Sequence, residues 1–287
     1  MNVKELLKNL SDDIIADIFL LSGDIINRNV DRIIISCKEI PKDKRKENAA
    51  LFLTTYGGSA DDAYRLIKFL KKTYKKVIVY VFGYCKSAGT LVAIGADEIV
   101  ISDFGELGPL DIQLSRADDY NYTSGLCYYQ ELDILRALAI QMFETQFTSL
   151  LDGSFGNITI KTAAEISSRL TVGILSPISS QVDPLQIGEV ERSIQIAKEY
   201  GKKLNIGDEI LDLFTMNYPS HRFVIDFDEA KKILKDKVRA PNDKELPLEK
   251  AMFNPIRIPR KENQISECIY SEYNENKAIG EKDEKPE

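Results

Sequence analysis

Apolar and polar positions alternate along the chain in a pattern that predicts buried strands separated by amphipathic helices. Residues 49–55, 77–82 and 98–102 are nearly continuous apolar runs, which are typical of strands buried on both faces of a parallel sheet. Between the first two runs, apolar residues recur at helical spacing from Ala63 to Leu70. Strands joined by single helices require right-handed crossovers, so the pattern predicts an α/β fold with a parallel sheet.

The N-terminal part of the chain predicts further elements before this region. Residues 1–16 have apolar side chains near one side of a helix. Residues 18–25 are a short β run, and the apolar residues at 32–36 are interpreted as a further β segment. The charged run at 42–48 is typical of a solvated loop.

The C-terminal half is predicted to be mostly helical. A long amphipathic helix is expected over residues 128–151, and a capping-box pattern at 162–165 opens a shorter one. Residues 173–184 are interpreted as an irregular connection, followed by a helix over 185–200. The chain is polar and charged from about residue 261, which predicts a disordered tail.

These elements predict a three-part organisation of the 287 residues. A chain of this length buries a full core as one large domain with an appendage. We expect an N-terminal helix over 1–16, a main domain over 17–240, and a C-terminal extension over 241–287.

Charge and composition exclude several classes of protein. The net charge of −7 argues against a nucleic-acid partner, which would require a basic face. No stretch approaches the roughly 20 apolar residues that span a bilayer, and the first residues lack the apolar segment of a signal peptide. The four cysteines are scattered and the chain has one histidine, so we expect no metal, no cofactor and free thiols. A cytoplasmic protein without membrane partners is expected.

The strongest chemical signal is a serine at a strand–turn–helix junction. The second apolar run ends at Gly83, and Ser87 opens a helix of small residues that continues to Ala96. Such a junction exposes a hydroxyl on a sharp bend and directs backbone N–H groups at a developing oxyanion. Ser87 is therefore predicted to be a nucleophile.

Two glycines are candidates for part of the oxyanion site that a serine nucleophile needs. Gly57 and Gly58 follow the first apolar run, and the carboxyl ends of parallel strands lie at the same edge of a sheet. We expect the N–H groups of Gly58 and Ala88 to bind one carbonyl oxygen. A tight turn is the alternative interpretation of the glycine pair.

A serine nucleophile also requires a base and a group that orients it. His221 is the single histidine, so any Ser–His mechanism must use it. Asp111, in a loop after the third apolar run, is the preferred orienting carboxylate because a buried aspartate needs a partner. The weaker alternatives are Asp97, Asp103 and Asp226, the last of which is expected to cap a helix.

A lysine dyad is a second way to activate the serine. Lys86 precedes Ser87, and a desolvated lysine can act as the base. Adjacent residues on a bend point in different directions, which disfavours this alternative. A phosphate-binding loop at residues 56–59 is excluded because the GxxxxGK[ST] spacing is absent.

Several short motifs, taken in their order along the chain, resemble those of a known family. Residues 57–59, 87–89 and 96–99 resemble the Clp-protease and signal-peptide-peptidase serine peptidases of the crotonase-like fold. Residues 107–113 and 218–225 are similar to the serine dehydrogenase proteinase family. The resemblance implies a Clp protease/crotonase-like fold, with a parallel β-sheet of repeated ββα units and surrounding helices.

The resemblance also implies a triad in an exchanged order. In the Clp protease the histidine follows the third strand and the aspartate precedes an Arg-Phe β run. Here these two places hold Asp111 and His221, and the serine dehydrogenase proteinase family is described with the order Ser, Asp, His. The resemblance therefore implies Ser87, Asp111 and His221, since a triad is defined by geometry and not by order. Three departures from the family pattern are expected. Residues 85–89 are not a strict G-x-S-x-G, Arg222 stands where relatives more often have glycine, and we expect no N-terminal membrane helix of the kind that archaeal relatives often carry.

Together these features predict a serine endopeptidase that acts on a peptide or protein substrate. Gly57, Gly108 and Pro109 are expected to bind the substrate. The resemblance further implies a homo-oligomer, formed through the helix at 128–151. It is also compatible with an unidentified partner protein. The alternatives are a crotonase-type hydrolase of acyl thioesters and a catalytically silent scaffold of the same fold.

Overall fold

The computed structural model describes residues 2–110, 113–114, 123–220, 222–272 and 274. The chain divides into two compact units. The first consists of Met1–Asp111 and Ile194–Glu287, and the second of Ile112–Ser193. The second unit is thus an insertion in the first, and each is described by itself.

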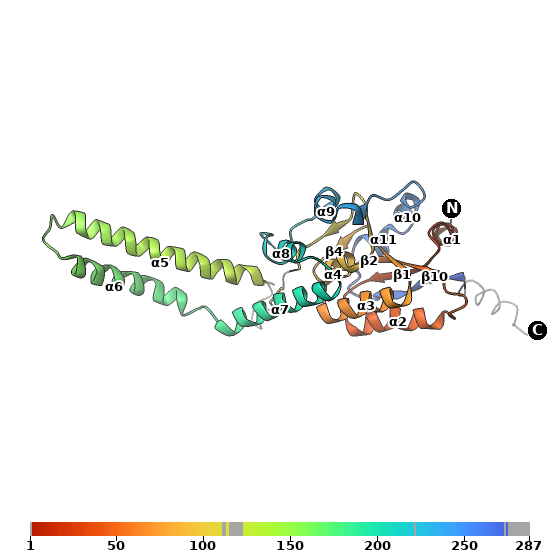
Figure 1. The fold of residues 1–287 in the computed structure, drawn as a ribbon, viewed down its shortest axis with the longest axis horizontal. Coiled ribbons are helices and arrows are strands. Elements are labelled where there is room, and N and C mark those ends of the chain that lie inside the picture. The colour runs from red at the N-terminus through yellow and green to blue at the C-terminus, as the bar shows by residue number, and fades with distance from the viewer. Residues whose placement is uncertain (1, 111–112, 115–122, 221, 273, 275–287) are drawn as a thin grey trace, which may run out of the picture. The chain divides into compact units, whose positions relative to one another are not determined.

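A six-stranded sheet forms the centre of the first unit, in the strand order β10-β1-β2-β3-β5-β9 (Figure 1). The five strands from β1 to β9 pair in parallel, and β10 pairs antiparallel with β1 at one edge. This mostly parallel sheet confirms the predicted α/β fold. The strands are β1 (Ala16–Ser22), β2 (Asn48–Thr54), β3 (Lys76–Val81), β5 (Glu98–Ile101), β9 (Val238–Arg239) and β10 (Ile265–Tyr270).

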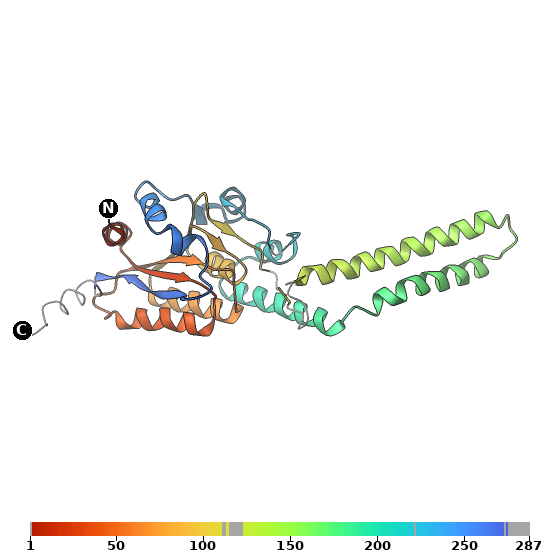
Figure 2. The same ribbon diagram turned by 180° about the vertical axis from the view of Figure 1, so that it is seen from behind.

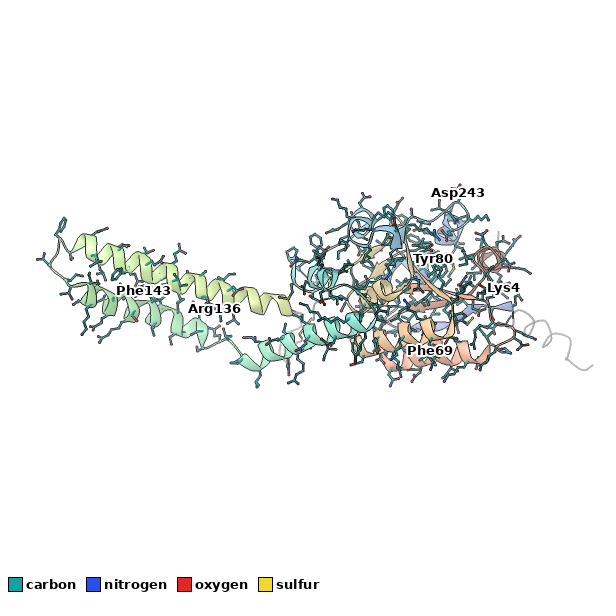
Figure 3. All side chains as sticks on the ribbon, in the orientation of Figure 1. Lys4, Phe69, Tyr80, Arg136, Phe143 and Asp243 are labelled. Atoms are coloured by element: carbon teal, nitrogen blue, oxygen red, sulfur yellow. The ribbon has the colours of Figure 1, made fainter. Side chains whose placement is uncertain are left out.

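Helices cover both faces of the sheet, because alternate strand residues point to opposite sides. On β3, Val79 packs in one core. Its neighbour Tyr80, which is labelled in Figure 3, packs in the other. The larger core lies beneath α2 (Asn27–Glu39), α3 (Ala60–Thr73), α4 (Ala88–Gly95), α8 (Asp208–Met216) and α9 (Phe227–Leu234). The smaller core lies beneath α1 (Val3–Asp13), α10 (Leu246–Ala251) and α11 (Phe253–Arg257).

Two short strands form a small second sheet outside the main sheet. After β3 the chain forms β4 (Tyr84–Cys85), which pairs in parallel with β6 (Glu106–Leu107), and then enters α4. The order β3–β4–α4 is a ββα unit of the kind that the family resemblance implies. Single bridges join Thr55 to Cys85 and Leu107 to Ile225. These bridges bring four separate segments of the chain together at one place.

The second unit consists mainly of two long helices. Helices α5 (Gly125–Gly153) and α6 (Ile160–Ser179) run antiparallel and side by side (Figures 1 and 2). A short antiparallel pair, β7 (Gln113–Leu114) and β8 (Thr123–Ser124), precedes them, and α7 (Pro184–Lys203) follows. Among the described residues, none of the helices combines the length and hydropathy needed to span a bilayer.

Three predictions from the sequence are corrected. Residues 32–36 lie in α2, whose buried Val30, Ile33 and Cys37 have helical spacing that the isoleucine run obscured. Most of the connection expected at 173–184 is the last part of α6, where Pro177 removes one backbone N–H donor close to the end of the helix. The tail expected to be disordered from residue 261 contains β10, which is held by pairing with β1.

Candidate active site

Ser87 occupies a strained turn between β4 and α4. Its backbone has φ 51° and ψ −119°, outside the conformations that non-glycine residues usually adopt. Such strain costs on the order of 1–3 kcal/mol and persists only where the surrounding structure holds it. The side chain is half-buried, and within the described parts of the chain its hydroxyl makes no hydrogen bond. The serine therefore has a hydroxyl free to react at an enforced bend.

Backbone hydrogen bonds on both sides hold this turn. The N–H of Thr55 donates to the carbonyl of Tyr84 at 2.7 Å, and the N–H of Lys86 donates to the carbonyl of Thr55 at 3.0 Å. On the other side, the N–H of Gly89 donates to the carbonyl of Lys86 at 2.8 Å. The position of Ser87 is thus fixed by the end of β2 and by the first turn of α4.

Gly57 lies directly against the serine. Its φ is +126°, and a Cβ atom at this position would lie 2.8 Å from Ser87 Cβ and 3.2 Å from Ser87 Oγ. Any side chain here would displace the hydroxyl, so glycine keeps the space beside it open. The structure therefore brings together the two motifs that the sequence placed at one edge of the sheet.

Gly58 and Ala88 supply N–H groups at the same place. Gly58 has φ +143° and packs beneath Ile25, whose carbonyl oxygen would lie 2.2 Å from a Cβ atom at this position. Neighbouring bonds secure the loop, since the N–H of Ser59 donates to that carbonyl at 2.8 Å. Within the described parts of the chain, the N–H groups of Gly58 and Ala88 have no hydrogen-bond acceptor. An oxyanion site requires N–H donors that have no other acceptor.

Lys86 has a role different from that of a base. Its buried ammonium donates to the carbonyls of Leu107 at 3.0 Å and Phe223 at 3.2 Å, and lies 3.4 Å from Glu106 Oε1. Burial lowers the pKa of this amine, and Glu106 partly opposes the change. Because three oxygens occupy its three N–H donors, the ammonium is committed to these contacts. This geometry argues against Lys86 as the partner of Ser87.

The segments that carry the other predicted residues meet next to the serine. Leu107 and Ile225 exchange backbone hydrogen bonds of 2.9 and 3.1 Å. The N–H of Gly108 donates to Thr90 Oγ1 at 3.2 Å, and Pro109, next in the chain, is buried. Asp111 follows the first of these segments and His221 precedes the second, but both residues lie outside the described part of the structure.

Two of the three alternative aspartates have structural roles. Asp97 accepts from the N–H of Val77 at 2.9 Å and pairs with Lys71 at 2.8 Å. Asp226 caps α9 by accepting from the N–H of Glu229 at 2.9 Å, as the sequence predicted. Asp103 is exposed. Asp111 therefore stays the preferred prediction for the orienting carboxylate.

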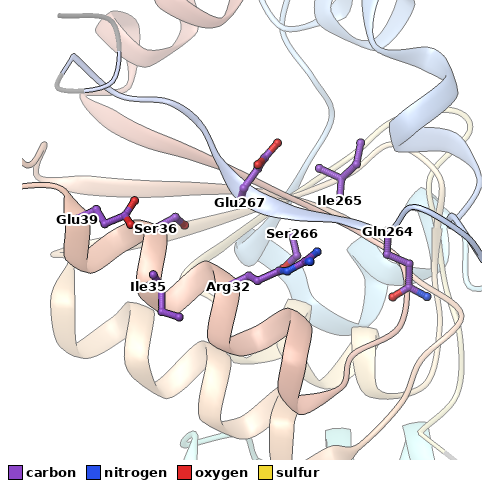
Figure 4. Close-up of a pocket in the computed structure, with 8 residues that line it drawn as sticks. All are labelled: Arg32, Ile35, Ser36, Glu39, Gln264, Ile265, Ser266 and Glu267. Carbon is purple, nitrogen blue, oxygen red and sulfur yellow. The ribbon is translucent and has the colours of Figure 1, made fainter. Parts of the chain in front are cut away.

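A pocket between α2 and β10 lies elsewhere in the first unit (Figure 4). Its lining includes Arg32 and Glu39 from α2 and Glu267 from β10. It contains none of the predicted site residues, and its mixed charges select no ligand class. The predicted catalytic residues therefore lie outside this pocket.

Comparison with known proteins gives one family match. Residues 24–127 match the model described as "ClpP-like SDH-type serine proteinase". This segment includes Gly57, Gly58, Ser87 and Asp111, whereas His221 lies beyond it.

The chain is also similar to two curated proteins of Methanocaldococcus jannaschii, both described as uncharacterized. It is 35% identical to the first over 86 residues, which are 30% of this chain and 29% of that protein. It is 30% identical to the second over 135 residues, which are 43% of this chain and 44% of that protein. The aligned segments thus span less than half the length of these relatives.

Among solved structures, the chain is similar to the 1510-N membrane-bound stomatin-specific protease. One structure of a variant of that protease has a TM-score of 0.49 and 16% identity, and covers 81% of this chain and 82% of the other. A second, in complex with a substrate peptide, has a TM-score of 0.48 and 14% identity, with coverages of 90% and 89%.

Proposed function

The resemblance to serine dehydrogenase proteinases is confirmed by the family match over residues 24–127, and from this premise we propose that the chain is a serine endopeptidase. The observation that carries the proposal is the strained turn of Ser87, with its free hydroxyl against Gly57. A positive φ at a non-glycine residue is costly, and such strain is concentrated at active sites. We therefore assign Ser87 as the nucleophile.

The proposed reaction proceeds through an acyl-enzyme. Ser87 Oγ attacks the peptide carbonyl while the imidazole of His221 takes its proton. The N–H groups of Gly58 and Ala88 bind the oxyanion of the tetrahedral intermediate. His221 then protonates the leaving amine, and water hydrolyses the ester by the reverse sequence of proton transfers. Asp111 orients the imidazole throughout.

The neighbouring backbone is proposed to hold the substrate. Gly57 leaves space beside the serine, and Gly108 and Pro109 follow β6, which pairs with β4 ahead of the nucleophile. An extended peptide would bind to this main chain through backbone hydrogen bonds.

The substrate class is tested by measuring hydrolysis on two sets of compounds. The wild-type chain is expected to cleave members of an unfractionated peptide library, detected by mass spectrometry, and acyl thioesters of matched length are measured in parallel. The Ser87→Ala variant serves as the control for contaminating peptidases. Ser87-dependent cleavage of thioesters without any Ser87-dependent cleavage of peptides would favour the crotonase-type hydrolase, and no Ser87-dependent cleavage of either set would favour the scaffold.

We propose that Lys86 is a positioning residue, because its ammonium binds the carbonyls of Leu107 and Phe223. Lys86→Met keeps the length of the side chain and removes these contacts. Since a displacement of about 1 Å can reduce rates by about 10²-fold, we expect kcat for peptide hydrolysis to fall roughly 10- to 100-fold, with KM little changed.

Lys237→Met is the matched control for this variant. Lys237 is a half-buried lysine bound to a backbone carbonyl, that of Ile94, and desolvation lowers its pKa to about 8. Both variants are expected to lose thermal stability, but only Lys86→Met is expected to lose kcat. An equal loss of kcat in both variants would show that Lys86 only stabilises the fold and does not position the active site.

A further inference from the structure

A basic pocket of about 570 Å³ lies in the first unit, between the start of α2 and the segment that leads into β10. Pockets that bind small molecules have volumes in this range. Three of its seven lining residues are basic, namely Arg28, Arg32 and Lys261, and none is acidic. It adjoins the pocket of Figure 4, because Arg32 and Gln264 line both.

The three basic side chains of this pocket have no anionic partner. Within the described ranges of the chain, the side chains of Arg28, Arg32 and Lys261 form no ion pair and no hydrogen bond. Asp31, between the two arginines in sequence, pairs instead with Arg65 at 3.1 Å. In Figure 4 the guanidinium of Arg32 extends toward Gln264 and away from Glu39. The pocket is therefore positively charged, in a chain whose net charge is −7.

Hydrogen bonds of two amide side chains hold one wall of the pocket in place. Asn29 is buried, and its Nδ2 donates to the carbonyl of Asp24 at 2.7 Å and to Gln264 Oε1. Gln264 Nε2 donates to the Asp24 carboxylate at 2.9 Å and to the carbonyl of Lys261 at 3.3 Å. Because both amide groups donate within the protein, the charged donors available to a ligand are those of the basic residues.

The position of Arg28 is unfavourable for the helix that carries it. Arg28 lies in the first turn of α2, which contains no acidic residue, and the helix dipole disfavours a cation there. A second basic pocket differs in this respect, because its Lys38 and Lys72 lie in the last turns of α2 and α3, where the dipole favours cations. Helix stability thus explains the lysines of the second pocket but not Arg28, for which an anionic ligand provides a reason.

The basic side chains fit a ligand that carries phosphate. The planar guanidinium of arginine binds a phosphate group through two parallel hydrogen bonds. A phosphate group carries about two negative charges, so a diphosphate balances three cations within a small volume. The single apolar residue of the lining, Ile26, offers too little surface for an acyl chain, which argues against a lipid.

We propose that this pocket binds a small molecule with a diphosphate group, which is held by Arg28, Arg32 and Lys261. The pocket is close in the chain to the candidate oxyanion loop, since Ile25 forms a bridge with Gly58 just before α2 begins. It contains none of the proposed catalytic residues, and binding there does not depend on the proposed peptidase activity.

Binding is tested by isothermal titration calorimetry of the full-length chain with inorganic pyrophosphate. The wild type is expected to bind this probe. Arg28→Gln and Arg32→Gln are each expected to weaken the affinity roughly 10-fold or more, because each removes a charge-assisted contact. Citrate is the ligand control, since it is also a multivalent anion, and it is expected to bind more weakly because it carries no phosphate.

The double variant Lys38→Gln/Lys72→Gln is the control for charge. It removes two exposed cations of the second basic pocket and is expected to keep the wild-type affinity. Thermal unfolding without ligand checks that each variant is folded. A wild type that does not bind pyrophosphate, an equal loss of affinity in the control variant, or citrate bound as tightly as pyrophosphate would each overturn the proposal. If the wild type ignored pyrophosphate but sedimented with phosphatidylglycerol vesicles, the phosphate would belong to a lipid headgroup instead.

Discussion

Replacing Ser87 by alanine is expected to reduce peptide hydrolysis by about 10³-fold or more while leaving the protein folded. Removal of a triad nucleophile eliminates covalent catalysis and leaves only the contribution of substrate binding and the oxyanion site. The free energy of unfolding is expected to change by less than about 1 kcal/mol, because the Ser87 hydroxyl makes no hydrogen bond within the described structure. Steady-state kinetics and urea unfolding measure the two quantities.

Ser59→Ala is the control, and it is expected to lower stability and not activity. Ser59 Oγ accepts from the N–H of Asp62 at 3.2 Å and caps α3, one residue after Gly58. Its removal is expected to cost about 1 kcal/mol of stability with little change in kcat. Full hydrolysis by Ser87→Ala would show that the cleavage has another origin.

Replacing His221 by alanine is expected to reduce hydrolysis by a similar factor, because no other histidine exists in the chain to take its place as the base. Asp111→Ala is expected to cause a smaller loss, since the imidazole remains but is no longer held in position. Residues of a triad act as a unit, so their losses are not additive. The double variant is therefore expected to be no slower than His221→Ala alone.

Arg222→Ala is the control for local disturbance of the loop, and is expected to retain most of the activity. The exchanged order of aspartate and histidine is tested by the same series. If the losses from His221→Ala and Asp111→Ala multiplied in the double variant, the two residues would act independently and not as partners on one serine.

The parallel sheet and the turn at Ser87 could be predicted because each depends on local sequence. Apolar runs such as residues 49–55 are read directly as buried strands, and a serine between a glycine-ended strand and a small-residue helix predicts a sharp bend. The contact between Gly57 and Ser87 also followed from sheet topology, since both succeed parallel strands.

The remaining features depend on tertiary contacts that local patterns do not contain. Strand β10 lies in a polar segment and is specified by its pairing with β1, some 240 residues earlier in the chain. Residues 33–35 have β-branched side chains but form a helix because Val30, Ile33 and Cys37 pack on the sheet. The contacts of Lys86 with Leu107 and Phe223 join segments far apart in sequence, so its role required the structure.

The assignment of Ser87 as the nucleophile is tested most directly by covalent labelling with a fluorophosphonate, which reacts with activated serines. The wild-type chain is incubated with the reagent, digested, and mapped by mass spectrometry. The assignment predicts one added phosphonyl group on the peptide that contains Ser87, and no labelling of Ser87→Ala or His221→Ala. Labelling of another serine, or an unlabelled wild type that still hydrolyses peptides, would contradict it.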